Sequence, residues 1–105
     1  MSRSSTTTDD EWLEIEHPGE MLVTEFLEPA ELTLNQLAAA IHVTPDALAS
    51  VLDGSTRIDA ELDLRLGRYF GISEGFFLRV QDGHDLVLAK RRIGGGLDMI
   101  VPRAA

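Results

Sequence analysis

The sequence contains no cysteine, which excludes disulfide bonds, thiolate metal sites and cysteine nucleophiles. It also lacks an uninterrupted apolar run near the ~18–20 residues that a membrane-spanning helix needs. The first residues are rich in Ser, Thr and Asp and carry a single Arg, unlike a secretory signal. We therefore expect a cytoplasmic protein that does not enter the membrane.

Basic residues are scarce as well. Nine Lys and Arg stand against 18 Asp and Glu, so the formal net charge is −9. A nucleic-acid-binding protein normally has a basic surface, because phosphate contacts supply much of its affinity. DNA binding by this chain must therefore come from a local arrangement of residues, while the acidic balance favours solubility and a basic protein partner.

The 105 residues are enough for one domain of ordinary size. Residues 1–16 are predicted to form a flexible N-terminal tail, because large hydrophobic side chains are almost absent before Trp12. Trp12 and Ile15 lie among acidic residues at the end of this tail. They are interpreted either as a cap over the core or as partner-binding residues that anchor another protein.

Five helices are predicted between Pro18 and Gly94, with almost no strand signal, so the expected fold is an all-α domain over residues 17–93. Thr33 and Gln36 form a capping box at the start of the second helix, and Thr44 caps the third. Asp59 is the expected N-cap of the fourth helix, and Ser73 that of the fifth. Residues 94–105 are predicted to be a C-terminal tail or a short strand at Leu97 to Val101.

The second and third helices are short and are joined by His42-Val43-Thr44, which predicts a helix-turn-helix. The small Ala38 lets the two helices cross closely, and Leu48 anchors the second of them in the core. The outward face is the candidate DNA-binding surface. Its predicted contact residues are Thr33, Asn35, Gln36, Thr44, Asp46, Ala47, Ser50 and Arg57.

The chemistry of this face is unusual for a DNA reader. Arg57 is its best single phosphate contact. A carboxylate at Asp46 repels phosphate, although it can accept a hydrogen bond from the N4 amino group of cytosine. An alternative interpretation is that the helix-turn-helix serves only as a scaffold.

Several motifs resemble the HigA-type antitoxins of bacterial toxin–antitoxin modules. They are His17-Pro18-Gly19-Glu20, Asn35-Gln36-Leu37-Ala38, Arg68-Tyr69-Phe70-Gly71 and the run from Ser73 to Leu78. These antitoxins belong to the XRE or Cro/CI-like class of helix-turn-helix proteins, so the resemblance implies a five-helix, lambda-repressor-like domain. It further implies a dimer that neutralises a cognate RelE-like ribonuclease toxin and binds operator DNA as repressor of its own promoter.

The sequence departs from the family pattern at several positions. His42 stands where the turn usually has Gly, which predicts a left-handed backbone at a non-glycine residue. Leu34 replaces a Gln that contacts DNA in many relatives, and Gly67 replaces Ala. Asp63 stands at a position expected to be apolar, so it needs a backbone N–H or an Arg as partner if it is buried.

No nucleophile with a matching base is present, so no enzyme activity is predicted. The three histidines, His17, His42 and His84, lack metal-ligand spacing, and no cofactor or metal is expected. Two alternatives to the antitoxin remain: a protein-interaction module that has lost operator readout, and a stand-alone XRE-type regulator. A homodimer is predicted from the apolar residues of the last helix and the C-terminal segment, namely Phe76, Phe77, Val80, Val87, Leu88 and Leu97 to Val101.

Overall fold

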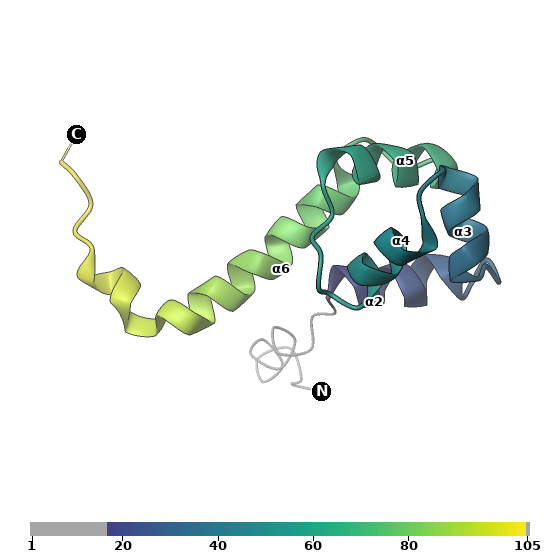
Figure 1. Ribbon diagram of the computed structural model, residues 1–105. Helices are drawn as coiled ribbons and strands as arrows, with labels where there is room; N and C mark the ends of the chain where they lie inside the picture. Colours follow the sequence, from purple (N-terminus) through teal and green to yellow (C-terminus); the bar gives the residue numbers. More distant parts are fainter. Residues whose placement is uncertain (1–16, 105) are drawn as a thin grey trace, which may run out of the picture.

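The computed structural model describes residues 17–104, which fold into five α-helices, one π-helix and one 3-10 helix, with no strand in that range (Figure 1). The order is α2 (Pro18–Leu22), the π-helix η1 (Val23–Leu27), α3 (Leu34–Ile41), α4 (Pro45–Leu52), α5 (Ala60–Phe70), α6 (Phe76–Ile93) and the 3-10 helix η2 (Gly94–Met99). The predicted all-α class is confirmed. Trp12 and Ile15 lie outside the described residues.

Side-chain caps fix where the first helices begin. The His17 Nδ1 atom accepts a hydrogen bond from the Gly19 N–H at 2.9 Å, and Pro18 occupies the first helical position. The predicted capping box is confirmed, since the Thr33 hydroxyl accepts from the Gln36 N–H at 3.1 Å and the Gln36 side chain accepts from the Thr33 N–H at 2.9 Å. Thr44 and Asp59 likewise cap α4 and α5. Each cap satisfies an amide that the helix itself leaves unpaired.

The start of α6 corrects one prediction. Ser73 is not its N-cap; the helix begins at Phe76, after Gly75 in a left-handed conformation with φ 88°. The reason is Asp63 on α5, whose carboxylate accepts from the N–H groups of Gly75, Phe77 and Leu78 at 2.6, 2.8 and 3.2 Å. A side chain 14 residues earlier thus serves the amides that an adjacent cap would have served.

Asp63 also joins two helices in the core. Its side chain is 2% exposed, and the expectation that it needs backbone partners is confirmed. A buried carboxylate is strongly destabilising unless charge-assisted hydrogen bonds compensate its desolvation. The three amides at the start of α6 supply that compensation, and they tie α5 to α6.

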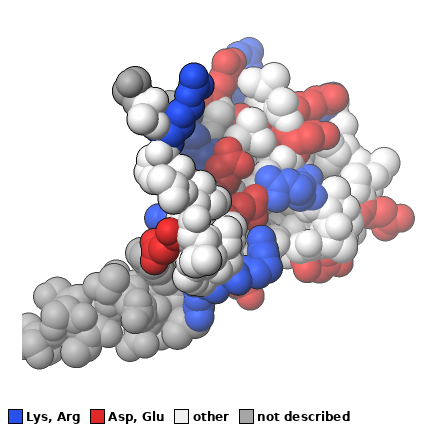
Figure 2. Space-filling model, turned by 90° about the vertical axis from the view of Figure 1, so that its left-hand side faces the viewer, with Lys and Arg blue, Asp and Glu red and all other residues white. Residues whose placement is uncertain are grey.

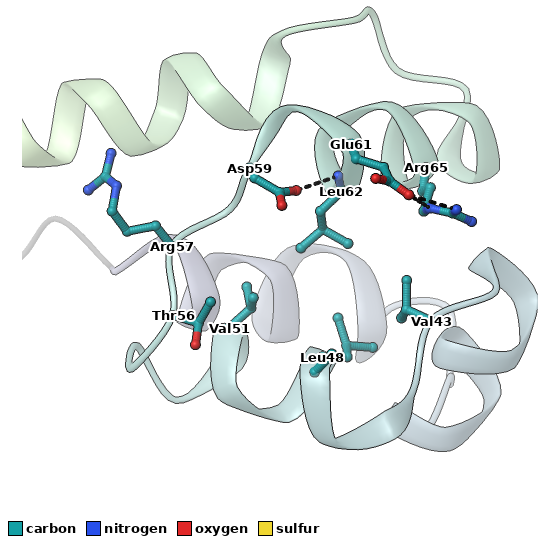
Figure 3. Close-up of a pocket in the computed structure, with 10 residues that line it drawn as sticks. Val43, Leu48, Val51, Thr56, Arg57, Asp59, Glu61, Leu62 and Arg65 are labelled. Carbon is teal, nitrogen blue, oxygen red and sulfur yellow. Dashed lines mark hydrogen bonds and ion pairs between the residues drawn. The ribbon is translucent and has the colours of Figure 1, made fainter.

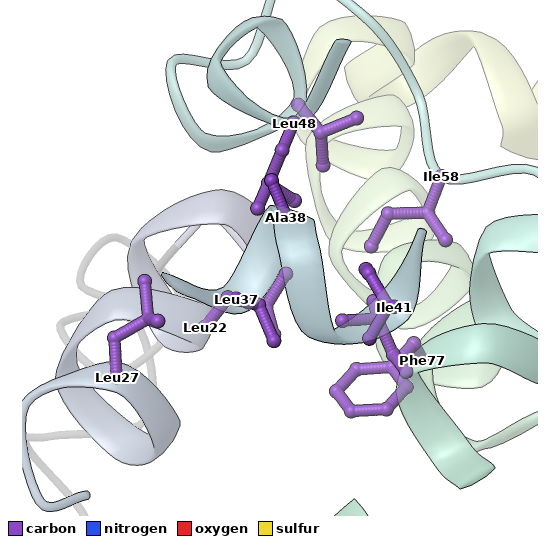
Figure 4. Close-up of a cluster of buried hydrophobic side chains, with 10 residues drawn as sticks. Leu22, Leu27, Leu37, Ala38, Ile41, Leu48, Ile58 and Phe77 are labelled. Atoms are coloured by element: carbon purple, nitrogen blue, oxygen red, sulfur yellow. The ribbon is translucent and has the colours of Figure 1, made fainter. Parts of the chain in front are cut away.

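The hydrophobic core contains at least one fully buried side chain from each α-helix: Leu22, Leu37 and Ala38, Leu48, Leu66, and Phe77. In Figure 4, Ala38 of α3 lies beside Leu48 of α4, which agrees with the close crossing predicted from its small side chain. Phe77 is 0% exposed, so it belongs to this core and cannot form part of a dimer surface. Phe76 also packs against the core as a partly buried residue.

The C-terminal half of α6 extends away from the other helices, and the described chain ends far from them (Figure 1). Gly94 ends α6 with φ 54°, and the residues that follow form η2 instead of the suggested strand. An isolated strand would leave its backbone groups without ladder partners, whereas a 3-10 turn pairs some of them locally. Within residues 17–104, no helix combines the length and hydropathy required to cross a membrane.

Candidate nucleic-acid interface

The two helices α3 and α4 pack against each other across a three-residue connection. His42 ends α3 in the left-handed conformation, with φ 65° and ψ 44°, as the departure from Gly predicts. The Val43 N–H then donates to the Ala38 carbonyl at 3.0 Å, which closes the turn. This geometry defines a helix-turn-helix.

Arg65 of α5 stabilises that turn through a hydrogen bond to the end of α3. Its Nη1 atom donates to the Ile41 carbonyl oxygen at 2.9 Å, at the C-terminal end of α3. The same guanidinium pairs with Glu61 one turn earlier, at 2.8 Å. The sequence analysis missed this role because helical spacing within α5 says nothing about which turn of another helix a side chain will reach.

Gln81 of α6 holds the loop that follows α4. Its side chain accepts from the Ile58 N–H at 2.7 Å and donates to the Ile58 carbonyl at 2.9 Å, and it is buried. This paired hydrogen bond fixes the backbone next to Arg57. The sequence did contain a signal, because Gln81 is a polar residue one turn after Phe77, on the buried face of the helix.

The predicted contact residues lie on α3, on α4, at the residues that cap them, and in the loop that follows α4. All are exposed except Ser50, which is half-buried. Several of their polar atoms are already engaged: Thr33 and Gln36 cap α3, the Thr44 hydroxyl accepts from the Ala47 N–H at 3.2 Å, and the Ser50 hydroxyl donates to the Ala47 carbonyl at 2.9 Å. The face therefore presents capped helix starts with few free side-chain donors.

Positive charge is absent from the helix-turn-helix itself. From Thr33 through Thr56 the sequence has no Lys or Arg and two carboxylates, Asp46 and Asp53. Arg57 is the nearest following cation, and its Nη1 atom lies 2.6 Å from the Asp85 carboxylate of α6. Figure 2 views the side of the molecule toward which the C-terminal half of α6 extends, and there too cations (blue) and carboxylates (red) are interspersed without a continuous basic surface.

Asp53 lies at the C-terminal end of α4 and organises the loop to Arg57. Its carboxylate accepts from the Ser55 hydroxyl at 2.6 Å and from the Ser55 N–H at 2.8 Å. These hydrogen bonds lower the pKa of Asp53, the hydroxyl contributing most and the N–H next. The carboxylate therefore stays ionised to a lower pH than that of an ordinary aspartate.

A groove of about 240 Å³ runs between α4 and the loop and first turns of α5. Its floor is apolar, with Leu48, Val51 and Leu62, and its rim is polar (Figure 3). Glu61 and Arg65 pair across part of the rim. In residues 17–104 no group of three or more His, Asp or Glu side chains could hold a metal ion.

Similarity to known proteins agrees with this geometry, although no family model matches the sequence. The chain is 39% identical over 75 residues to virulence-associated protein I of Dichelobacter nodosus, which covers 71% of this chain and 69% of that protein. Across the curated relatives that it matches, the chain spans 61% to 70% of their lengths.

Two solved structures are similar in fold and sequence. An addiction module antidote protein of the HigA family from Coxiella burnetii matches with a TM-score of 0.76 and 30% identity, over 86% of this chain and 98% of that one. A Pseudomonas aeruginosa protein in complex with its operator DNA matches with a TM-score of 0.79 and 31% identity, over 84% of this chain and 96% of that one.

Fold and site thus define a helix-turn-helix protein of the XRE type. Within that class, the chain belongs to the HigA family of antitoxins. The resemblance noted in the sequence is confirmed, and HigA antitoxins are not enzymes, as expected. His17, the family-like first residue of the His-Pro-Gly-Glu motif, caps α2, and its ring lies edge-on to His84 with centroids 5.5 Å apart.

Proposed function

We propose that the protein is an antitoxin that binds operator DNA in its own promoter through α3 and α4 and represses transcription. The observation that carries the proposal is the helix-turn-helix with both helix starts capped and exposed. The first amides of such helices favour phosphate oxygens, and the start of the second helix faces the base edges in proteins of this class. The similar protein solved in complex with its operator DNA supports operator binding by this fold.

Within this proposal, each predicted contact residue has either a phosphate-binding or a base-reading role. Thr33, Asn35, Gln36 and Thr44 lie at the helix starts and suit phosphate contacts, and Arg57 supplies the nearest positive charge. Asp46, Ala47 and Ser50 lie along α4, where base edges would be read. With so few cations, binding will involve few phosphates and a weak dependence on salt.

The second half of the proposal concerns a toxin. We infer that the protein neutralises a cognate RelE-like ribonuclease, whose RNA-binding face is basic and complements the net charge of −9. Trp12 and Ile15, beyond the described residues, are the proposed toxin-binding anchors. Trp12 emission should shift to shorter wavelength on adding the toxin, and an unchanged spectrum would contradict this assignment.

We further propose a homodimer formed through exposed apolar residues at the end of the chain. These residues, here called the C-terminal strip, are Leu86, Leu88, Ile93, Leu97, Met99, Ile100 and Val101. Val101 is 85% exposed and Met99 80%, which is unusual for side chains of this kind in a stable monomer. A two-fold pair would present two copies of α4 to a palindromic site.

A second candidate function rests on the charges of the interface. The lack of cations from Thr33 to Thr56, with Arg57 already paired, favours a module that inhibits a toxin without reading an operator. A stand-alone regulator without a toxin is the other alternative. Co-purification with the product of the adjacent gene, followed by a mobility shift on the upstream DNA, distinguishes all three.

In that experiment the antitoxin proposal predicts both a stable complex with a small basic protein and a shifted upstream duplex. A complex without a shift favours the interaction module. A shift without a complex favours the stand-alone regulator.

A further inference from the structure

The outward surface of α4 carries two polar side chains one turn apart. Asp46 is exposed and Ser50 is half-buried, while Leu48 between them is fully buried in the core. In a helix, residues four apart lie on the same face, so Asp46 and Ser50 form one edge opposite Leu48. If α4 enters the major groove as proposed above, this edge meets the bases.

Neither of these side chains presents an unengaged donor to a base in the structure. An ionised carboxylate such as that of Asp46 only accepts. The Ser50 hydroxyl has one proton, and it is donated to the Ala47 carbonyl at 2.9 Å. Pro45, which precedes Asp46, and the intervening Ala47, Leu48 and Ala49 have no polar side-chain atoms, so the side chains from Pro45 to Ser50 offer acceptors alone.

An acceptor-only edge distinguishes the four bases sharply. Guanine presents N7 and O6 and thymine presents O4 in the major groove, and all three atoms are acceptors that a carboxylate repels. Adenine presents an amino group beside the acceptor N7. Cytosine presents only its N4 amino group, so it is the base that matches this edge best.

We propose that Asp46, assisted by Ser50, selects a cytosine N4 amino group in each operator half-site. This inference rests on the proposed DNA binding and adds to it the base that α4 reads. It also gives the missing cations a role in specificity. A helix without Lys or Arg gains little binding energy from phosphate contacts, whatever the DNA sequence. Most duplexes therefore only repel Asp46. The cytosine amino group at one position then decides which duplex is bound.

The test changes single atoms of the DNA. A bound duplex is first selected from a random-sequence pool at low salt with the full chain, and its protected bases are mapped. Each protected cytosine is then replaced in turn by N4-methylcytosine, which keeps the pairing with guanine but blocks the amino hydrogen in the groove. Affinity is measured for the unaltered protein, for Asp46→Ala and for Glu28→Ala, which removes the same charge from an exposed residue outside α3 and α4.

We expect one cytosine in each half-site at which methylation weakens binding of the unaltered protein by about 5- to 150-fold. Glu28→Ala should show the same sensitivity, whereas Asp46→Ala should bind methylated and unmethylated duplexes equally. Circular dichroism checks that each variant retains its helices.

Two results would overturn the inference while leaving DNA binding intact. One is a selected duplex in which no methylated cytosine changes the affinity by more than twofold. The other is an Asp46→Ala variant that keeps the full sensitivity. Failure to select any duplex from the pool contradicts the proposed function itself, and the inference with it.

Discussion

Arg57 and Asp85 form an ion pair of 2.6 Å that joins the loop after α4 to the middle of α6 across 28 residues of sequence. Asp82, one turn earlier on α6, lies 3.9 Å from the same guanidinium. The cation best placed to meet a DNA phosphate is therefore held by two carboxylates of the last helix. Binding to phosphate must exchange these partners.

This pair leads to the first prediction. Asp85→Asn should strengthen binding to any duplex by about 1.5- to 5-fold per subunit, because an exposed ion pair of this kind is worth only ~0.2–1 kcal/mol. Arg57→Ala should weaken binding to all sequences and reduce the slope of log affinity against log salt by about 1 per subunit. Anisotropy titrations over a range of salt concentrations measure both effects.

Glu28→Gln is the charge-matched control for Asp85→Asn, since Glu28 is exposed and forms no ion pair with Arg57. Equal effects of the two substitutions would show that overall charge matters and that the specific pair does not.

A second prediction concerns Asp63. Asp63→Ala leaves three amide groups at the start of α6 without an acceptor, and two of them, those of Phe77 and Leu78, are in its first turn. The Phe77 amide is buried and those of Gly75 and Leu78 are part-buried, so the free energy of unfolding should fall by at least about 1–3 kcal/mol, which is the cost of one unpaired buried group. Denaturant unfolding followed by circular dichroism measures the change.

Glu61→Ala is the matched control for Asp63→Ala, because it removes a carboxylate two residues earlier on α5, in an exposed ion pair. It should cost less than about 1 kcal/mol. Similar losses in the two variants would contradict the capping role of Asp63.

The helix caps also show which features of the fold could be predicted from the sequence alone. The capping box of Thr33 and Gln36, the left-handed His42 and the helix-turn-helix could all be predicted, because each depends on residues close together in the chain. Asp63 could be identified as a residue needing a partner, but its partners lie on the next helix. The sequence therefore placed a local cap at Ser73 where a distant carboxylate acts instead.

In the candidate site, too, the features that depend on nearby residues could be predicted and those that depend on distant residues could not. Exposure of the outward residues of α3 and α4 follows from helical periodicity and was predicted correctly. Three other contacts depend on how α5 and α6 cross the domain. They are the ion pair of Arg57 with Asp85, the hydrogen bond of Arg65 to the end of α3, and the paired hydrogen bonds of Gln81 with Ile58. Periodicity within one helix contains no information on that crossing.

A third prediction concerns the C-terminal strip. The unaltered protein should sediment as a dimer at tens of micromolar, and Ile93→Glu combined with Ile100→Glu should convert it to a folded monomer, because burying two carboxylates in an apolar interface is strongly unfavourable. Leu64→Glu, which alters an exposed apolar residue of α5, should leave the dimer intact. A monomer before substitution would contradict the assignment.

A fourth prediction follows from the lowered pKa of Asp53. Because the folded-state pKa is below the unfolded one, the ionised carboxylate contributes stability above its unfolded pKa, and this contribution is lost as the pH falls through the folded pKa. Ser55→Ala removes the hydroxyl that is the main cause of the shift, so the pKa of Asp53 should rise toward its ordinary value. An NMR titration of the side-chain carboxyl tests this, and an unchanged pKa in the variant would contradict it.

The central claim, that the exposed face of α3 and α4 binds operator DNA, is tested most directly by anisotropy titration of the upstream duplex at low salt. Three proteins are compared: the unaltered chain, Ala47→Glu on the proposed interface, and Ala104→Glu at the far C-terminal end. The account predicts saturable binding by the unaltered chain and by Ala104→Glu, and its loss in Ala47→Glu. It would be contradicted if the unaltered chain failed to bind with or without its toxin, or if Ala47→Glu bound as tightly as the control.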